Sequence, residues 1–368
     1  MRGGGTGRTR IPRRSAPRRH RAVGGDVRDL EQVLARYEAT LVADDATSAR
    51  ALVEELLADG IDPVTVLTDV VARTQREVGT RWQRGEWTVA QEHAATAISV
   101  AATKAVSRHV RRTPVTRGRI LVACSEREWH ALPAMIIDCA LRADGWDSTL
   151  LGAATSPMRL NQHLQDLGPE AVAVSCSVLG ALPTTRRFIE ASTAAGVPIV
   201  VGGPAFGADD VRARALGATA WAPSAQAAVL AVNGLPAVVP PAPPLPAGPA
   251  GEQALLEVDH RMLVDTLRVR WSVSAAAGPP EAASPGDLTD VANDVLHQVL
   301  HAVAATLLTG DPRPVSESAW WIADLMRTRG IDVATVYELG DVLTESLSDY
   351  PLARGLIDRH FTAGIDWT

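Results

Sequence analysis

The segment "CSEREWHALPA" (residues 124–134) places a carboxylate and an imidazole two positions apart, as Glu128 and His130. It follows an apolar run of strand character and precedes one of helical character, so both side chains are expected in a strand-to-helix turn. A neutral imidazole can ligate a transition metal, and a carboxylate nearby can fix its tautomer. A lone histidine in a turn is more often a surface or structural residue, so the surrounding elements must decide between these interpretations.

Residues 119–232 have the pattern of a parallel α/β domain. The runs "RILVACS", "DSTLLG", "AVAVSCS" and "PIVVGG" are short, rich in aliphatic residues and separated by helical stretches. This alternation predicts a doubly wound parallel sheet, which binds ligands beyond the carboxyl ends of its strands. The residues expected at that edge are His130, Ser175, Ser177, Gly202 and Gly203.

Four helical patterns with short connections, within residues 26–114, predict an antiparallel four-helix bundle. Trp82 ends the third helix, and Glu92 and His93 lie in the first turns of the fourth. A tight turn at Gly85 is expected to bring these three side chains together. On their own, a tryptophan and a histidine at helix ends are more often packing and surface residues.

The remaining segments have distinct compositions. Residues 1–25 form an Arg-rich tail that we expect to be disordered, and residues 233–251 form a Pro-rich linker that we expect to be semi-rigid. Residues 252–368 have helical patterns and no strand pattern. The predicted fold class is therefore multidomain α and α/β.

Composition limits the function classes. The chain of 368 residues is 46% hydrophobic with a net charge of −6, and no apolar run is long enough to span a bilayer. Because basic residues cluster in the tail, broad nucleic-acid binding is not expected; a transit peptide or a nucleic-acid-binding arm would share the tail's Arg-rich look but would need features it lacks. The odd set of cysteines, Cys124, Cys139 and Cys176, without a secretory signal, predicts a reduced, cytoplasmic protein.

The α/β segment resembles the cobalamin-binding Rossmann-like domain. That family carries a D/E-x-H-x-x-G motif, an S-x-L motif and a Gly-Gly pair, matched here by Glu128 with His130, by Ser177 to Leu179, and by Gly202 with Gly203. The resemblance implies that His130 is the lower axial cobalt ligand, that Glu128 tunes it and that the glycines admit the nucleotide tail of the cofactor. Two positions depart from the pattern: Pro133 replaces the motif glycine, and Ser175 lies as close to the strand end as Ser177.

The spacing W-x(9)-E-H in the bundle resembles the light-sensing cobalamin photoreceptors of the CarH type. The resemblance implies that Trp82, Glu92 and His93 cap the adenosyl group of adenosylcobalamin, whose cobalt–carbon bond light breaks. In that family a helix-turn-helix precedes the bundle, whereas here the Arg-rich tail does, so no direct DNA binding is expected. A histidine that ligates cobalt after illumination is Gln83 here, which leaves His93 or water as the upper ligand.

The domain order resembles the photocobilins, in which a globin-like helical domain binds biliverdin. The resemblance implies a noncovalent bilin, since residues 252–368 contain no cysteine. Candidate contacts are an i, i+4 histidine pair, tryptophans to flank a tetrapyrrole and arginines for its propionates: His297, His301, Trp271, Trp320, Trp321, Arg268, Arg270 and Arg327. Two histidines without a third ligand make zinc unexpected, while haem on one of them stays open.

The sequence thus predicts a photoreceptor rather than an enzyme. It would bind adenosylcobalamin and biliverdin and signal to an unknown partner through a change in domain packing or in homo-oligomeric state. The alternative is a corrinoid methyl carrier of a cobalamin-dependent methyltransferase system, which would not need Trp82 or residues 252–368. A cobalamin-responsive interaction protein without photochemistry is a third interpretation.

Overall fold

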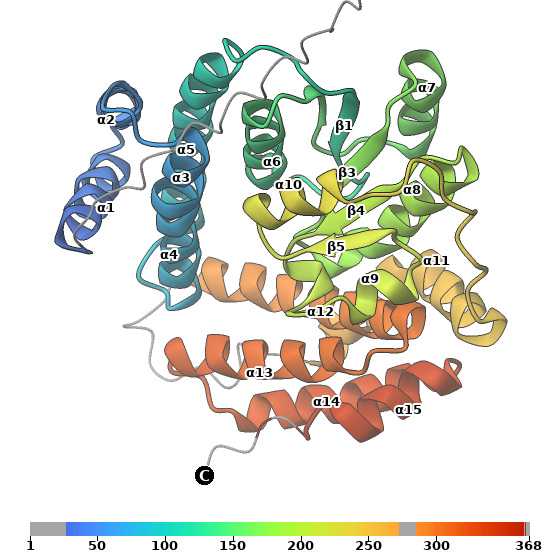
Figure 1. The fold of residues 1–368 in the computed structure, drawn as a ribbon. Helices are drawn as coiled ribbons and strands as arrows, with labels where there is room; N and C mark the ends of the chain where they lie inside the picture. The colour runs from blue at the N-terminus through green and yellow to red at the C-terminus, as the bar shows by residue number, and fades with distance from the viewer. Residues whose placement is uncertain (1–26, 272–284, 364, 366–368) are drawn as a thin grey trace, which may run out of the picture.

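The computed structural model describes residues 27–271, 285–363 and 365 (Figure 1). A helical bundle, a sheet with helices on both sides and a second group of helices follow one another along the chain. The linker of residues 233–251 is shorter than predicted, because helix α11 already begins at Ala247. The Arg-rich tail lies outside the described residues.

The bundle consists of four helical rods. The first two are α1 (Val27–Val42) and α2 (Ala46–Ala58), the third runs through α3 (Pro63–Thr65), the π-helical η1 (Val66–Val71) and α4 (Ala72–Gln83), and the fourth is α5 (Val89–Val110). The third rod is continuous because the residues at its internal junctions are all right-handed helical. A capping box, in which Thr88 and Gln91 exchange hydrogen bonds, starts α5 directly after the turn. The π segment was not predicted, because it keeps the apolar period of an ordinary helix.

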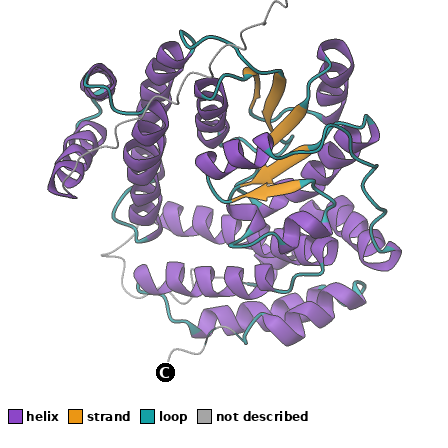
Figure 2. Cartoon of the chain, in the orientation of Figure 1, coloured by secondary structure: helices purple, strands orange, loops and turns teal. Residues whose placement is uncertain are grey.

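The sheet has five parallel strands in the order β2-β1-β3-β4-β5, drawn in orange in Figure 2. The four predicted strands are confirmed, and the short fifth was missed: β1 (Arg119–Cys124), β2 (Asp147–Gly152), β3 (Ala171–Ser175), β4 (Ile199–Gly202) and β5 (Ala220–Ala222). Cys124 pairs with Ser175, and Ser175 with Gly202. The turns after β1, β3 and β4 therefore lie side by side at one edge.

Helices cover both faces of the sheet. Those on one face are α6 (Ala131–Ala143) and α10 (Ala225–Asn233), and those on the other are α7 (Pro157–Leu167) and α8 (Leu182–Ala194). The turns after β3 and β4 carry the 3-10 helices η2 (Leu179–Ala181) and η3 (Pro204–Phe206), and α9 (Val211–Ala215) precedes β5. This is the Rossmann-like arrangement that the alternating pattern predicts.

In the part of the third domain that the structure describes there are five helices: α11 (Ala247–Arg270), α12 (Pro285–Thr309), α13 (Arg313–Thr328), α14 (Ala334–Ser346) and α15 (Pro351–His360). Helix α14 ends at Ser346, and Pro351 starts a separate helix, as proline favours at a first turn. The expectation that no apolar run is long enough to span a bilayer is wrong by length and composition, because Val291–Thr309 of α12 meets both; 61% of that window, however, is buried inside the protein. It is the core helix of its domain. The globin-like arrangement stays a prediction.

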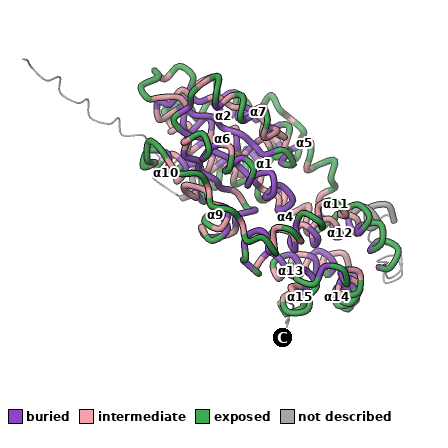
Figure 3. The backbone as a smooth tube through the Cα atoms, turned by 90° about the vertical axis from the view of Figure 1, so that its right-hand side faces the viewer, coloured by how far each residue is buried: buried purple, intermediate pink, exposed green. Residues whose placement is uncertain are grey.

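The third domain packs against the sheet domain through α12, and Figure 3 shows the backbone of both coloured by burial. Ala302, Ala305 and Leu308 of α12 belong to the same buried cluster as the residues under the sheet. Beside them Arg212 is only 1% exposed and pairs with Asp311, with Nε and Oδ2 2.8 Å apart. Removing one partner of such a buried pair would leave an uncompensated charge, so the two domains form one unit here.

Candidate cofactor site

Glu128 and His130 form the centre of the site, in the turn between β1 and α6. Glu128 is fully buried, and its Oε1 lies 2.6 Å from Nδ1 of His130 and accepts the backbone N–H of His130 at 2.8 Å. Its Oε2 accepts the backbone N–H groups of Ser177 and, at 3.2 Å, of Val178. The side chain of His130 is 62% exposed. With Nδ1 engaged, Nε2 is the ring nitrogen left for a ligand, as in metal-binding histidines held by a carboxylate.

The electrostatics of this pair support a ligand role. Burial acts to raise the pKa of Glu128, but hydrogen bonds from the His130 ring and the Ser177 amide outweigh it and lower the pKa. The hydrogen bond to Glu128 raises the pKa of His130 against its partial burial, and the charges of Glu128 and Glu92 add to this effect. The carboxylate is thus held ionised, which strengthens the imidazole as a donor once its proton is displaced.

The bundle faces the sheet domain at this point, because Leu132 and Ile136 of α6 belong to the buried cluster of the bundle, and the charge of Glu92 contributes to the raised pKa of His130. Glu92, in the first turn of α5, accepts a hydrogen bond from Thr96 Oγ1 at 2.8 Å, and its Oε2 lies 3.5 Å from Nε2 of His93. His93 is 75% exposed. Trp82 is half-buried in the last turn of α4, across the turn at Gly85 from these residues.

Gln83 is used for a different contact. Its Nε2 donates to Oδ2 of Asp324 in the third domain at 2.8 Å. The side chain of Gln83 is therefore engaged in a contact between two domains.

Gly202 and Gly203 are required by the protein's own backbone. A Cβ on Gly202 would lie 2.3 Å from the carbonyl oxygen of Ala222, and one on Gly203 2.4 Å from that of Cys176. Gly203 also has φ +105°, in the region that favours glycine. The pair thus has a structural reason to be glycine in addition to any contact with a nucleotide tail.

The other motif residues fall around the same edge. Ser175 is buried at the end of β3, whereas Ser177 is half-buried and its amide reaches Glu128, which favours the Ser177 to Leu179 register. Leu179 is buried at the start of η2. Pro133 is the third residue of α6, where a backbone N–H has no partner within the helix, so its missing donor costs no helical hydrogen bond.

A histidine that the sequence analysis missed completes a cluster in the third domain. His260 of α11 stacks on His301 with ring centroids 4.6 Å apart, and its Nε2 lies 2.8 Å from Nδ1 of His297. Burial lowers the pKa of His301 to about 3 and that of His260 to about 4. His301 also meets Gly180 of η2, where a Cβ would lie 2.7 Å from the ring. No local spacing reveals His260, because it joins His297 across 37 residues.

Of the other bilin candidates, Arg268 lies near the histidines, since its charge adds to burial in lowering the pKa of His297; the three tryptophans have other contacts. Trp271 is buried and donates to Thr335 O at 2.9 Å, Trp320 is 47% exposed, and Trp321 packs against the core of the third domain. The arginines are paired on the surface, Arg268 with Asp265, Arg270 with Glu345, and Arg327 with Asp324.

A cavity of about 20 Å³ beside His301 is lined by residues of α11, α12, η2 and the start of α8, and by Arg127 of the turn after β1. None of the three tryptophans lines it. Among the described residues, no group of three or more His, Cys, Asp or Glu could hold a metal ion.

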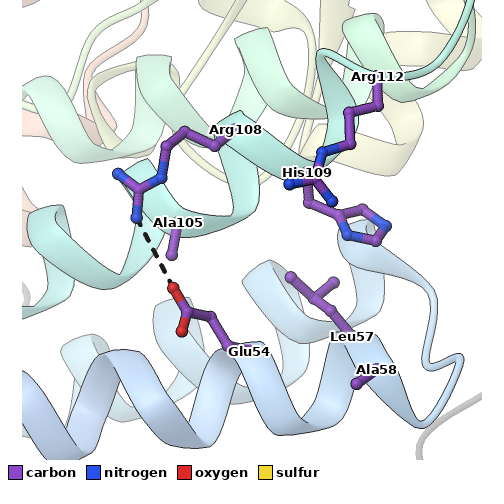
Figure 4. A pocket seen from close by; sticks show the side chains of 7 residues that line it. All are labelled: Glu54, Leu57, Ala58, Ala105, Arg108, His109 and Arg112. Atoms are coloured by element: carbon purple, nitrogen blue, oxygen red, sulfur yellow. Dashed lines mark ion pairs between the residues drawn. The ribbon is translucent and has the colours of Figure 1, made fainter.

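A larger cavity, of about 300 Å³, lies between α2 and α5 (Figure 4). Leu57, Ala58 and Ala105 contribute apolar contacts, and Arg108 lies 3.8 Å from Glu54 across it. It is at the C-terminal part of α5, about 24 Å along the helix from Glu92 at 1.5 Å per residue. This cavity is therefore separate from the site at His130.

Two family comparisons match the segments that build the His130 site. Residues 118–231 match the B12 binding domain, and residues 33–106 match a second family of the same description, which covers the bundle. The chain is a cobalamin-binding protein. The donor set agrees, since His130 offers one free ring nitrogen on a turn whose geometry Glu128 fixes.

Solved structures similar to this cobalamin-binding protein each cover 55% of it. The Methanosarcina barkeri monomethylamine corrinoid protein is 17% identical, with 98% of its chain covered and a TM-score of 0.48. A cobalamin-binding protein from Desulfitobacterium hafniense DCB-2 is 19% identical, with 97% covered and a TM-score of 0.30. The methanol:cobalamin methyltransferase complex MtaBC from Methanosarcina barkeri is 16% identical, with 81% covered and a TM-score of 0.30. No curated protein matches the sequence.

Proposed function

We propose that this protein is a light sensor that binds adenosylcobalamin between the bundle and the sheet domain. The observation that carries the proposal is the opposition of two turns. The α4–α5 turn has Trp82 at one side and Glu92 and His93 at the other, and α6, which begins directly after His130, packs against the bundle through Leu132 and Ile136. A cofactor held by His130 would thus have a large aromatic side chain and an acid–imidazole pair on the side of the bundle.

The residues have separate tasks in this proposal. His130 Nε2 would bind cobalt from below, while Glu128 holds Nδ1 and the ring orientation. Bound adenosylcobalamin would supply a cobalt–carbon bond that light breaks. Trp82 would cover the adenosyl side and exclude water from it. His93, which is exposed and not buried in packing, is the imidazole available to the upper face after illumination.

The test is an absorbance spectrum of the protein loaded with adenosylcobalamin, recorded in the dark and after green light. A light-induced change in the absorbance spectrum that indicates a different ligand on cobalt, together with a change in size-exclusion elution, would support a sensor. A spectrum and elution profile that do not change under light, with methylcobalamin turnover by an added methyltransferase, would instead support the corrinoid methyl carrier. In that case Trp82→Ala would leave turnover almost intact.

The proposal includes biliverdin as the ligand of the third domain. Its supporting observation is the group of neutral imidazoles, His260, His297 and His301, beside Gly180 of the sheet domain. A tetrapyrrole needs a site of several hundred Å³, whereas the cavity at His301 has about 20 Å³, so binding requires that α11 and α12 separate. Titration with biliverdin, followed by its red absorbance band, tests this. Equal spectra for the protein and for His301→Ala would contradict a site at the histidines.

A further inference from the structure

The third domain contacts the bundle at the end of α4, next to Trp82. Arg329, directly after α13, donates from Nη1 to the carbonyl oxygen of Gln83 at 2.8 Å and from Nη2 to that of Trp82 at 3.2 Å. Thr328 Oγ1 also donates to Gln83 O at 3.2 Å, and Gln83 Nε2 donates to Asp324 at 2.8 Å. We call this contact of Asp324, Thr328 and Arg329 with the end of α4 the α4 clasp.

The clasp adds donors to the C-terminal end of α4, which is the negative end of the helix dipole. Trp82 O already accepts the Gly85 N–H at 2.9 Å, so Arg329 is a second donor there, whereas Gln83 O accepts from Arg329 and Thr328. A guanidinium fits there because it combines a charge with several N–H donors in a fixed fork. Arg329 also donates to Leu325 O of its own helix at 3.2 Å, so one half-buried side chain joins the C-terminal ends of two helices from different domains.

The helix that carries the clasp, α13, is itself fixed to the sheet domain. The other end of α13 carries Arg313, whose Nη1 lies 2.7 Å from Oδ2 of Asp209. Next to it is the buried pair of Arg212 and Asp311, and α12 contributes side chains to the core beneath the sheet. Figure 1 shows α13 running from the side of the sheet domain to below the end of α4. The end of α4 is therefore held relative to the domain that carries His130.

We propose that the third domain positions Trp82 over the cobalamin site through the α4 clasp, which makes Arg329 a positioning residue for the upper axial face. This rests on the proposed function insofar as Trp82 contacts the adenosyl group. Its consequence is directional: loosening the clasp lets the end of α4 move, which weakens binding of cobalamin with a bulky upper ligand but not of cobalamin with a small one.

Hydrogen exchange of the full chain without cobalamin tests the clasp itself. The amides of Gly85, Glu86 and Trp87 donate to the carbonyls of Trp82 and Arg81 and close the α4–α5 turn. Arg329→Ala is expected to speed their exchange about tenfold by making local opening easier. Arg354→Ala is the matched control, because it removes a third-domain arginine whose ion-pair partner, Asp358, lies in its own helix α15. It is expected to leave these amides unchanged.

Titration with two cobalamin forms tests the positioning. Arg329→Ala should weaken adenosylcobalamin binding about tenfold, the equivalent of about 1.4 kcal/mol and of one hydrogen bond to a charged group, and hydroxocobalamin binding less than twofold. Arg329→Lys should give an intermediate loss because it keeps the charge without the fork. Unchanged exchange in Arg329→Ala, or an equal loss for both forms, overturns the proposal.

Two further controls keep the test decisive. If Arg329→Ala does not fold, as judged by circular dichroism, Thr328→Val removes a clasp hydrogen bond from a shorter side chain and should act in the same direction. If the unaltered protein binds both cobalamin forms equally tightly, the role proposed for Trp82 fails. The exchange measurement, which needs no cobalamin, then still decides whether the clasp holds the end of α4.

Discussion

The carboxylate of Glu128 contacts both His130, in its own turn, and Val178, in the turn after β3. One of its oxygens lies 2.6 Å from Nδ1 of the His130 ring, and the other accepts the backbone N–H of Val178 at 3.2 Å. The turn after β1 is thereby tied to the turn after β3, which the sheet register places next to it. The carboxylate therefore fixes the tautomer of the imidazole and also connects the two turns. This double role explains why a fully buried acid is ionised here, since each oxygen has donors.

Replacing this acid should weaken cobalamin binding. Glu128→Gln keeps an oxygen acceptor but removes the charge that supports His130, and the loss of such a supporting group typically costs 10- to 100-fold in metal affinity. Absorbance titration with hydroxocobalamin measures it. The matched control is Glu126→Gln, two residues earlier and exposed, which should bind like the unaltered protein. Equal affinity of both variants would sink the role given to Glu128.

Cobalamin affinity should depend on pH through His130. Because the pKa of this ring is raised, chiefly by its hydrogen bond to Glu128, a proton competes with cobalt for Nε2 below that pKa, and affinity should fall up to tenfold per pH unit there. Above it the ring is neutral and affinity should be flat. Glu92→Gln removes a charge that raises this pKa, so its profile should move to lower pH. A profile that Glu92→Gln leaves in place would contradict the facing of the two turns.

Gly203 should be the most sensitive glycine of the site edge. Gly203→Ala places a Cβ 2.4 Å from Cys176 O on a backbone with φ +105°, so we expect destabilisation of about 2 kcal/mol or more. Gly79→Ala is the control: the position is inside α4 with nothing within 4 Å of the new methyl, and helix propensity predicts a gain of about 0.5–1 kcal/mol. Urea unfolding of both variants measures this. If Gly203→Ala were neutral, the close approach of the two turns would be wrong.

The sequence predicts this edge of the site well because its residues are local to strand ends. The runs before Cys124, Ser175 and Gly202 are long enough to be recognised as strands, and parallel pairing then fixes that their ends meet. The same reasoning cannot find β5, whose three residues are shorter than any alternating pattern, nor the π segment, whose apolar spacing stays helical.

Contacts between domains were beyond prediction for a different reason. Arg329 meets Gln83 across 246 residues, and His260 meets His297 between two helices. Neither pair has a spacing that a periodic pattern can reveal, because both depend on how finished helices pack. The candidate tryptophans show that residue type alone does not place a side chain in a cofactor site. Trp271 and Trp320 are both residues that could flank a tetrapyrrole, yet Trp271 is buried in the core and Trp320 is exposed on the surface.

The histidine cluster should make the third domain sensitive to acid. In the folded protein burial holds the pKa of His301 at about 3 and that of His260 at about 4, below the ordinary value of 6.5. The unfolded chain therefore binds more protons between these values, so stability is complete above about pH 6.5 and falls as the pH drops toward 4. The melting temperature measured from pH 7 to pH 4.5 should decline, and His301→Asn should flatten that decline while lowering stability at pH 7.

His163→Asn, on the surface of α7, is the control and should keep the slope of the unaltered protein. A slope that His301→Asn leaves unchanged would show that other groups cause the acid sensitivity.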